Sequence, residues 1–159
     1  MSRYVLVVLV LLSALSCAIR AGTVGPGSPQ MTADAITEIA FERRCFGCDR
    51  ELSITIRRDG TATRTVPGNA RLGVAERQSR AEVSRAAFDE IAKLIVAEGF
   101  PGFKDEYRDP SIADGEWAVT TVTAGTARKA VADRHGMAPP ALVRIQARIE
   151  ALIKTTVWK

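Results

Sequence analysis

The residues of this chain best suited to chemistry are Cys45 and Cys48, which stand two residues apart in the segment RRCFGCDR. Such a pair can be a redox catalyst, half of a zinc site or a structural bridge. A catalytic C-x-x-C usually lies at a helix N-terminus, where the helix dipole and free N–H groups stabilise the thiolate. Here the pair leads into residues 52–57, whose alternating pattern predicts a β-strand. This context favours a structural pair.

A thiol-disulfide oxidoreductase or redox sensor remains the alternative function. Arg43, Arg44 and Arg50 flank the cysteines, and their positive charge can lower the pKa of a thiol. The sequence contains none of the motifs G-x-S-x-G, H-E-x-x-H or a phosphate-binding glycine loop. We therefore predict no catalytic residue outside this pair, and a non-enzymatic role is favoured.

Metal or cofactor binding has little support in the sequence. Zinc sites need about four ligands, whereas C-x-x-C supplies two, and the single histidine, His135, lies far along the chain in a glycine-containing loop. The acidic segment 105–116 offers oxygen ligands for calcium but lacks the spacing of an EF-hand. We therefore predict no metal and no cofactor, and we interpret His135 as a turn residue.

The N-terminus has the pattern of an export signal. Arg3 precedes an uninterrupted apolar run over residues 4–15, which is shorter than the roughly 20 residues that span a bilayer. The following SALSC resembles the lipobox of bacterial lipoproteins, which implies a signal peptide over residues 1–16 and a lipidated Cys17. The alternative is an ordinary signal peptide cut after Ala18. Both predict export to the periplasm or cell envelope, lipid-anchored to the membrane in one case and secreted in the other.

Cysteine parity supports a disulfide between Cys45 and Cys48. The chain has three cysteines, and an odd thiol is unusual in an exported protein. Lipidation of Cys17, or its removal with the leader, leaves the other two as an isolated pair. Two thiols so close in sequence are expected to join in an oxidising compartment.

Composition indicates one globular domain behind a tether. Of the 159 residues, 47% are hydrophobic and 25% are charged, and residues 17–34 are rich in Gly, Pro, Ser and Thr. We place the domain at residues 35–159. The net charge of +4 is modest, and the arginines are scattered without interleaved aromatic residues, so we predict no nucleic-acid binding.

The first half of the domain predicts a hairpin followed by a helix. Thr37, Ile39 and Phe41 alternate with polar residues, as do the apolar residues of 52–57, and Asp59-Gly60 is typical of a two-residue hairpin turn. Residues 69–78 are ambiguous, with one more short strand as one interpretation. An S-x-x-E capping box at Ser79 and Glu82 then predicts a helix that Gly99 ends. Its apolar residues at helical spacing are Val83, Ala87, Ile91, Leu94 and Ile95.

The second half repeats this order. Residues 117–124 and 126–133 predict a second hairpin that turns near Gly125, and Pro139-Pro140 predicts the start of a second helix with one apolar stripe. An antiparallel sheet covered on one face by two helices buries both helical stripes. We therefore predict an α+β fold with a sheet of four to five strands and two helices on one face.

Residues 36–159 resemble a family of uncharacterised exported bacterial domains that open with Cys-Phe-Gly-x-Cys-Pro. The resemblance rests on CFGC before a strand, LSITIRRDGTAT, TARKAVADRHG and PPALVRIQARIEAL. It implies an exported α+β domain without assigned activity. The layout is more distantly similar to emfourin-like inhibitors of thermolysin-type metalloproteases, which implies a protease as a possible protein partner.

The long loop after the first helix is the candidate binding region, because loops of this length are often functional. Its candidate residues are Phe100, Phe103, Tyr107, Asp114 and Trp117. The alternative is that the two phenylalanines plug the sheet edge and Tyr107 seals the core. We predict a non-enzymatic envelope protein that binds a protein partner, with protease inhibition as its most concrete form.

Overall fold

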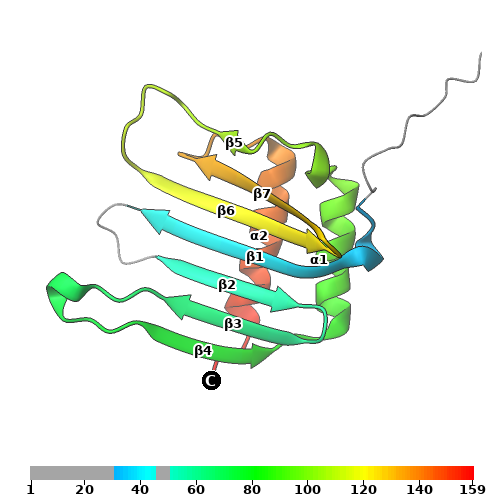
Figure 1. Ribbon diagram of the computed structural model, residues 1–159, viewed down its shortest axis with the longest axis horizontal. Coiled ribbons are helices and arrows are strands. Elements are labelled where there is room, and N and C mark those ends of the chain that lie inside the picture. The colour runs from blue at the N-terminus through cyan, green and yellow to red at the C-terminus, as the bar shows by residue number, and fades with distance from the viewer. Residues whose placement is uncertain (1–30, 46–50) are drawn as a thin grey trace, which may run out of the picture.

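The strands of this protein form one sheet, and both α-helices lie on the same face of it (Figure 1). The computed structural model describes residues 31–45 and 51–159. The strands are β1 (Ile36–Cys45), β2 (Leu52–Arg57), β3 (Thr61–Val66), β4 (Arg77–Glu82), β5 (Glu106–Tyr107), β6 (Glu116–Ala124) and β7 (Ala127–Arg134). The helices are η1 (Ala33–Ala35), η2 (Ala70–Leu72), α1 (Arg85–Ala97), η3 (Phe100–Gly102) and α2 (Pro140–Thr155).

The described strands have the order β4-β3-β2-β1-β6-β7-β5, and all neighbours are antiparallel except β5 and β7. The predicted α+β fold with a largely antiparallel sheet and two helices is confirmed. The prediction of four to five strands is wrong, because the sheet has seven in the part of the chain that the structure describes. The additional strands are β4, which is polar and largely exposed, and β5, which has two residues. Neither has the apolar alternation by which a strand is recognised.

The predicted first hairpin forms with a different turn. Three residues, 58–60, connect β2 to β3 where two were expected, and Gly60 at their end has a φ of 94°. A three-residue hairpin turn commonly ends in such a left-handed residue, which favours glycine. The Asp59 carboxylate accepts hydrogen bonds from the hydroxyl and amide of Thr61, which lower the pKa of Asp59 below its usual value.

The start of the first helix differs from its prediction. Ser79 and Glu82 belong to β4, and the helix begins at Arg85 behind Ser84, whose hydroxyl accepts a hydrogen bond from the amide of Ala87 at 3.2 Å. An N-cap residue is defined by its backbone geometry and its side-chain hydrogen bond, so Ser84 rather than Ser79 is the N-cap of this helix. Gly99, with a φ of 70°, follows the last turn as predicted.

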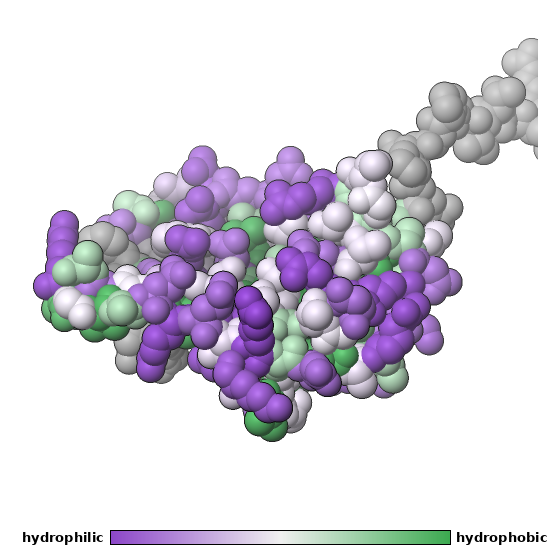
Figure 2. Space-filling view, turned by 60° about the horizontal axis from the view of Figure 1, so that its bottom comes forward, coloured by the Kyte–Doolittle hydropathy of each residue, from purple (hydrophilic) through white to green (hydrophobic). Residues whose placement is uncertain are grey.

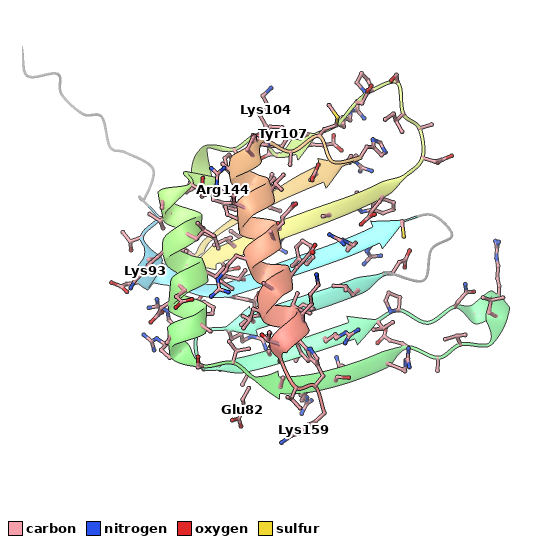
Figure 3. The ribbon with its side chains drawn as sticks, turned by 180° about the vertical axis from the view of Figure 1, so that it is seen from behind. Glu82, Lys93, Lys104, Tyr107, Arg144 and Lys159 are labelled. Atoms are coloured by element: carbon pink, nitrogen blue, oxygen red, sulfur yellow. The ribbon has the colours of Figure 1, made fainter. Side chains whose placement is uncertain are left out.

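The core lies between the sheet and the two helices (Figure 3). In β1, a register shift between Ile36 and Glu38 places Ile36 in the core and leaves Thr37 exposed, although the alternation predicted Thr37 on the inner face. The largest fully buried side chains are Phe41, Phe88, Phe100, Ile36, Ile39, Ile54, Ile56, Ile91, Ile95, Leu142, Ile145 and Ile149. The helical stripes of α1 and α2 therefore pack on one continuous apolar face of the sheet.

Candidate functional site

Several loops meet at one end of the sheet because antiparallel neighbours run in opposite directions. β1 ends at Cys45 opposite Glu116, where β6 begins, and β7 ends beside the same point of β6. β3 runs in the same direction as β1, and it ends at Val66 opposite Arg77, where β4 begins. The connections that follow β3, precede β6 and follow β7 therefore extend beyond one end of the sheet, at the left of Figure 1.

We call residues 67–76, 108–115 and 135–139 the loop end. The large hydrophobic side chains that are exposed within the described residues are Leu72, Val74, Ile112, Met137, Val143 and Val157. Four of these six belong to the loop end, whereas one lies on α2 and one in the C-terminal segment. These four side chains lie in three separate loops at the same end of the sheet, which makes this end the candidate interaction surface.

The β3–β4 hairpin presents the most exposed of the four loop-end side chains, Leu72, in a defined conformation. The Asn69 carboxamide oxygen accepts hydrogen bonds from the amides of Arg71 and Leu72, at 3.1 and 3.3 Å. Asn69 and Val74 exchange two backbone hydrogen bonds, at 2.8 and 3.0 Å. Leu72 is 75% exposed at this tip, and Figure 2 shows hydrophobic residues at the same end of the molecule. A side chain on a pre-organised loop loses less entropy when it binds.

Gly68 allows the hairpin to fold back on its own backbone. A Cβ at this position would lie 2.6 Å from both the Glu76 amide nitrogen and the Val74 carbonyl oxygen, closer than real Cβ contacts allow. Only glycine therefore fits here without a backbone shift. The close approach fixes the base of the tip that carries Leu72.

The second loop of this end, residues 108–115, is also ordered by a local turn. The Asp109 carboxylate accepts hydrogen bonds from the hydroxyl and amide of Ser111, at 2.6 and 2.8 Å. These bonds hold the pKa of Asp109 below its usual value, and the turn they form presents Ile112 to solvent. Asp114, a predicted binding residue, is exposed in the same loop.

His135 connects this loop to the one that follows β7. Its backbone has a φ of 61°, and its amide donates to the Glu116 carbonyl at 3.0 Å. The imidazole covers Gly115 so closely that a Cβ there would lie 2.5 Å from the ring. The structure thus places His135 in a turn, as predicted, and this turn leads to the exposed Met137.

The aromatic candidates from the sequence do not form one surface. Phe100 is fully buried, Phe103 meets its ring edge-on at 5.7 Å, and Tyr107 meets Phe103 at 6.4 Å between ring centroids. These three rings extend the core behind the end of α1, which agrees with the alternative interpretation that they plug the sheet edge and seal the core. Trp117 lies apart from them in β6, where the Arg134 guanidinium stacks 5.6 Å from its ring centroid.

Cys45 is the last residue of β1, and it is 8% exposed. Its sulfur is disulfide-bonded. Cys17 and Cys48 lie outside the described residues, so the predicted lipidation and the Cys45–Cys48 pairing stay predictions.

The sequence prediction missed Leu72 and Val74. Both lie in residues 69–78, the segment that the sequence left ambiguous. The residues between Asn69 and the polar β4 show neither helical nor strand periodicity. The available signal was local, because Asn69 and Gly73 are turn residues that bracket an apolar side chain. Two apolar residues inside a turn are expected to be exposed to solvent rather than buried.

Two further kinds of site are a metal centre and a membrane-spanning helix. Residues 31–45 and 51–159 contain no cluster of three or more His, Cys, Asp or Glu side chains that could hold a metal ion. None of the helices in these ranges is long and apolar enough to cross a membrane. The sequence matches no protein-family model, and no curated protein is significantly similar to it.

Proposed function

We propose that this chain is an exported, non-enzymatic domain that binds a protein partner through its loop end. The observation that carries the proposal is the ordered β3–β4 hairpin, which exposes Leu72 and Val74 at the same end of the sheet as the loop of Ile112. Protein interfaces are built around a few apolar anchor residues that fit into pockets of the partner. The loop end also exposes charged side chains that suit the rim of such an interface, namely Arg71, Glu76, Arg108 and Asp114.

Protease inhibition is the most concrete form of this proposal. A narrow hairpin that projects from a rigid sheet can enter a cleft, and pre-organisation lowers the entropic cost of holding it there. The layout of strands and helices is similar to that of emfourin-like inhibitors, which act on thermolysin-type metalloproteases. We accordingly expect the tip residues around Leu72 to contact the active-site region of such an enzyme.

Changing Leu72 to Asp should weaken partner binding by about thirtyfold or more, because an anchor residue lost from an interface costs at least about 2 kcal/mol. The measurement is inhibition of a thermolysin-type metalloprotease, together with capture of partners from the envelope fraction. The matched control is Val157→Asp, since Val157 is an apolar residue about as exposed as Leu72 and lies in the C-terminal segment after α2, outside the loop end. Equal effects of the two variants, or no inhibition and no captured partner with the parent protein, would contradict the proposal.

We further propose that Cys17 carries a lipid and that Cys45 is bonded to Cys48. Intact mass of the protein purified from the envelope should then show a diacyl or triacyl addition on a chain that starts at Cys17. Alkylation before reduction should leave Cys45 and Cys48 unmodified. A lipid-free chain would contradict the anchor, and two alkylated thiols would contradict the bridge and favour the thiol oxidoreductase.

A further inference from the structure

A groove of about 340 Å³ lies on the helix-covered side of the sheet, under the last turns of α2. Phe41 and Leu52 of the sheet form one wall, and Ile153 and Trp158 form the other. The volume equals about eleven water molecules at their share of liquid volume. It falls in the range of small-molecule sites, which are mostly apolar with a few polar groups.

The wall that contains Trp158 is held in place by the backbone. The Lys159 amide donates to the Arg80 carbonyl at 2.8 Å, and the Arg80 amide donates to the Lys159 carbonyl at 2.9 Å. The Trp158 indole donates to the Ile153 carbonyl at 3.3 Å. Figure 3 shows the segment that follows α2 crossing to β4, where Lys159 and Glu82 are labelled. The groove is thus already formed without a ligand.

The charges that line the groove are unbalanced. Arg43 forms ion pairs with Glu150 and Glu116, so it is neutralised within the protein. Arg64 and Lys154 also line the groove, but neither forms an ion pair with a carboxylate among residues 31–45 and 51–159.

Arg64 is the more informative of these two cations. It belongs to β3 and lies opposite Ile54, on the face of the sheet that the helices cover. Its Nε atom is removed from solvent and has no hydrogen-bond partner in the described structure. A guanidinium held partly out of water without a partner is costly, and a carboxylate is the group that matches its fork of donors.

We propose that this groove binds a small carboxylate that has an apolar body. The carboxylate pairs with Arg64 and Lys154, and the apolar body contacts Phe41, Leu52 and Trp158. The site is separate from the loop end, so it does not depend on the protein-binding proposal. It assigns a ligand role to two cations that have no ion-pair partner in the part of the chain that the structure describes.

The test uses octanoate as the probe, with octan-1-ol and octylamine as the neutral and cationic analogues of the same chain length. A Trp117→Phe background leaves Trp158 as the single tryptophan, since the chain has two, and its fluorescence reports binding. Octanoate should bind saturably and about tenfold or more tightly than octanol, and octylamine should bind no better than octanol. Equal binding of octanoate and octanol would show an apolar groove without anion recognition and would overturn the proposal, as would a lack of saturable binding.

Arg64→Gln should remove the preference for octanoate while leaving octanol binding unchanged. The matched control is Arg80→Gln, because Arg80 is an exposed residue of β4 that does not line this groove, and it should retain the preference. If Arg64→Gln fails to fold, Lys154→Gln takes its place, since Lys154 is exposed in the last turn of α2. A preference for octanoate that survives in both folded variants would refute the assignment of these cations.

Discussion

Replacing Phe100 with Ala should lower the free energy of unfolding by about 3–5 kcal/mol. Phe100 is fully buried behind the end of α1, and its ring meets Phe103 edge-on. The truncation removes a large apolar side chain and leaves a cavity that the rigid sheet cannot close. Urea unfolding followed by circular dichroism measures the change. Partner binding by the folded variant should be unaffected, because Phe100 presents no surface.

Ile112→Ala is the control for Phe100→Ala, because Ile112 is also a large apolar residue but is exposed in the loop end. The sequence analysis did not single it out. Its substitution should change the free energy of unfolding by no more than about 0.5 kcal/mol. The same small effect for Phe100→Ala would mean that this ring is not part of the core. It would then return to the list of binding residues that the sequence suggested.

Replacing Arg58 with Ala should destabilise the protein by about 2–4 kcal/mol, because one guanidinium holds three parts of the fold together. Its side chain is 16% exposed, and it donates to the carbonyls of Ala33 and Asp34 at 2.8 and 2.7 Å. It also donates to the Asp89 carboxylate of α1 at 2.9 Å and stacks 5.6 Å from the Phe88 ring centroid. The substitution leaves these acceptors without their donor. Thermal unfolding of the variant measures the loss of stability.

The neighbouring arginine gives the matched control for Arg58. Arg57 is exposed, and it pairs with Glu38 at 3.0 Å across the sheet surface. Exposed ion pairs contribute about 0–1 kcal/mol, so Arg57→Ala should have a small effect. Arg58→Lys should recover only part of the stability, because an ammonium cannot reproduce the planar fork of donors. Equal losses for Arg57→Ala and Arg58→Ala would refute the role assigned to Arg58.

Elements with local signals were predictable from the amino-acid sequence. The alternation of residues 52–57 and the Asp59-Gly60 pair located the first hairpin, and Gly125 located the second. Pro139-Pro140 marked the start of α2, and the spacing of its apolar residues marked the buried face. Each of these signals depends on backbone preferences or on periodicity within a few residues, so it can be recognised without knowledge of neighbouring elements.

The positions of the exposed and unpartnered groups depend on tertiary contacts. β4 is polar and becomes a strand because β3 lies beside it, so a capping-box pattern at Ser79 was misleading. Leu72 and Ile112 lie at the same end of the sheet because β3 ends and β6 begins there, although these strands are distant in sequence. Arg64 lines a groove with residues of α2 and the C-terminal segment, and its Nε atom has no hydrogen-bond partner among the described residues. These features depend on contacts between distant segments, and local patterns contain no information about such contacts.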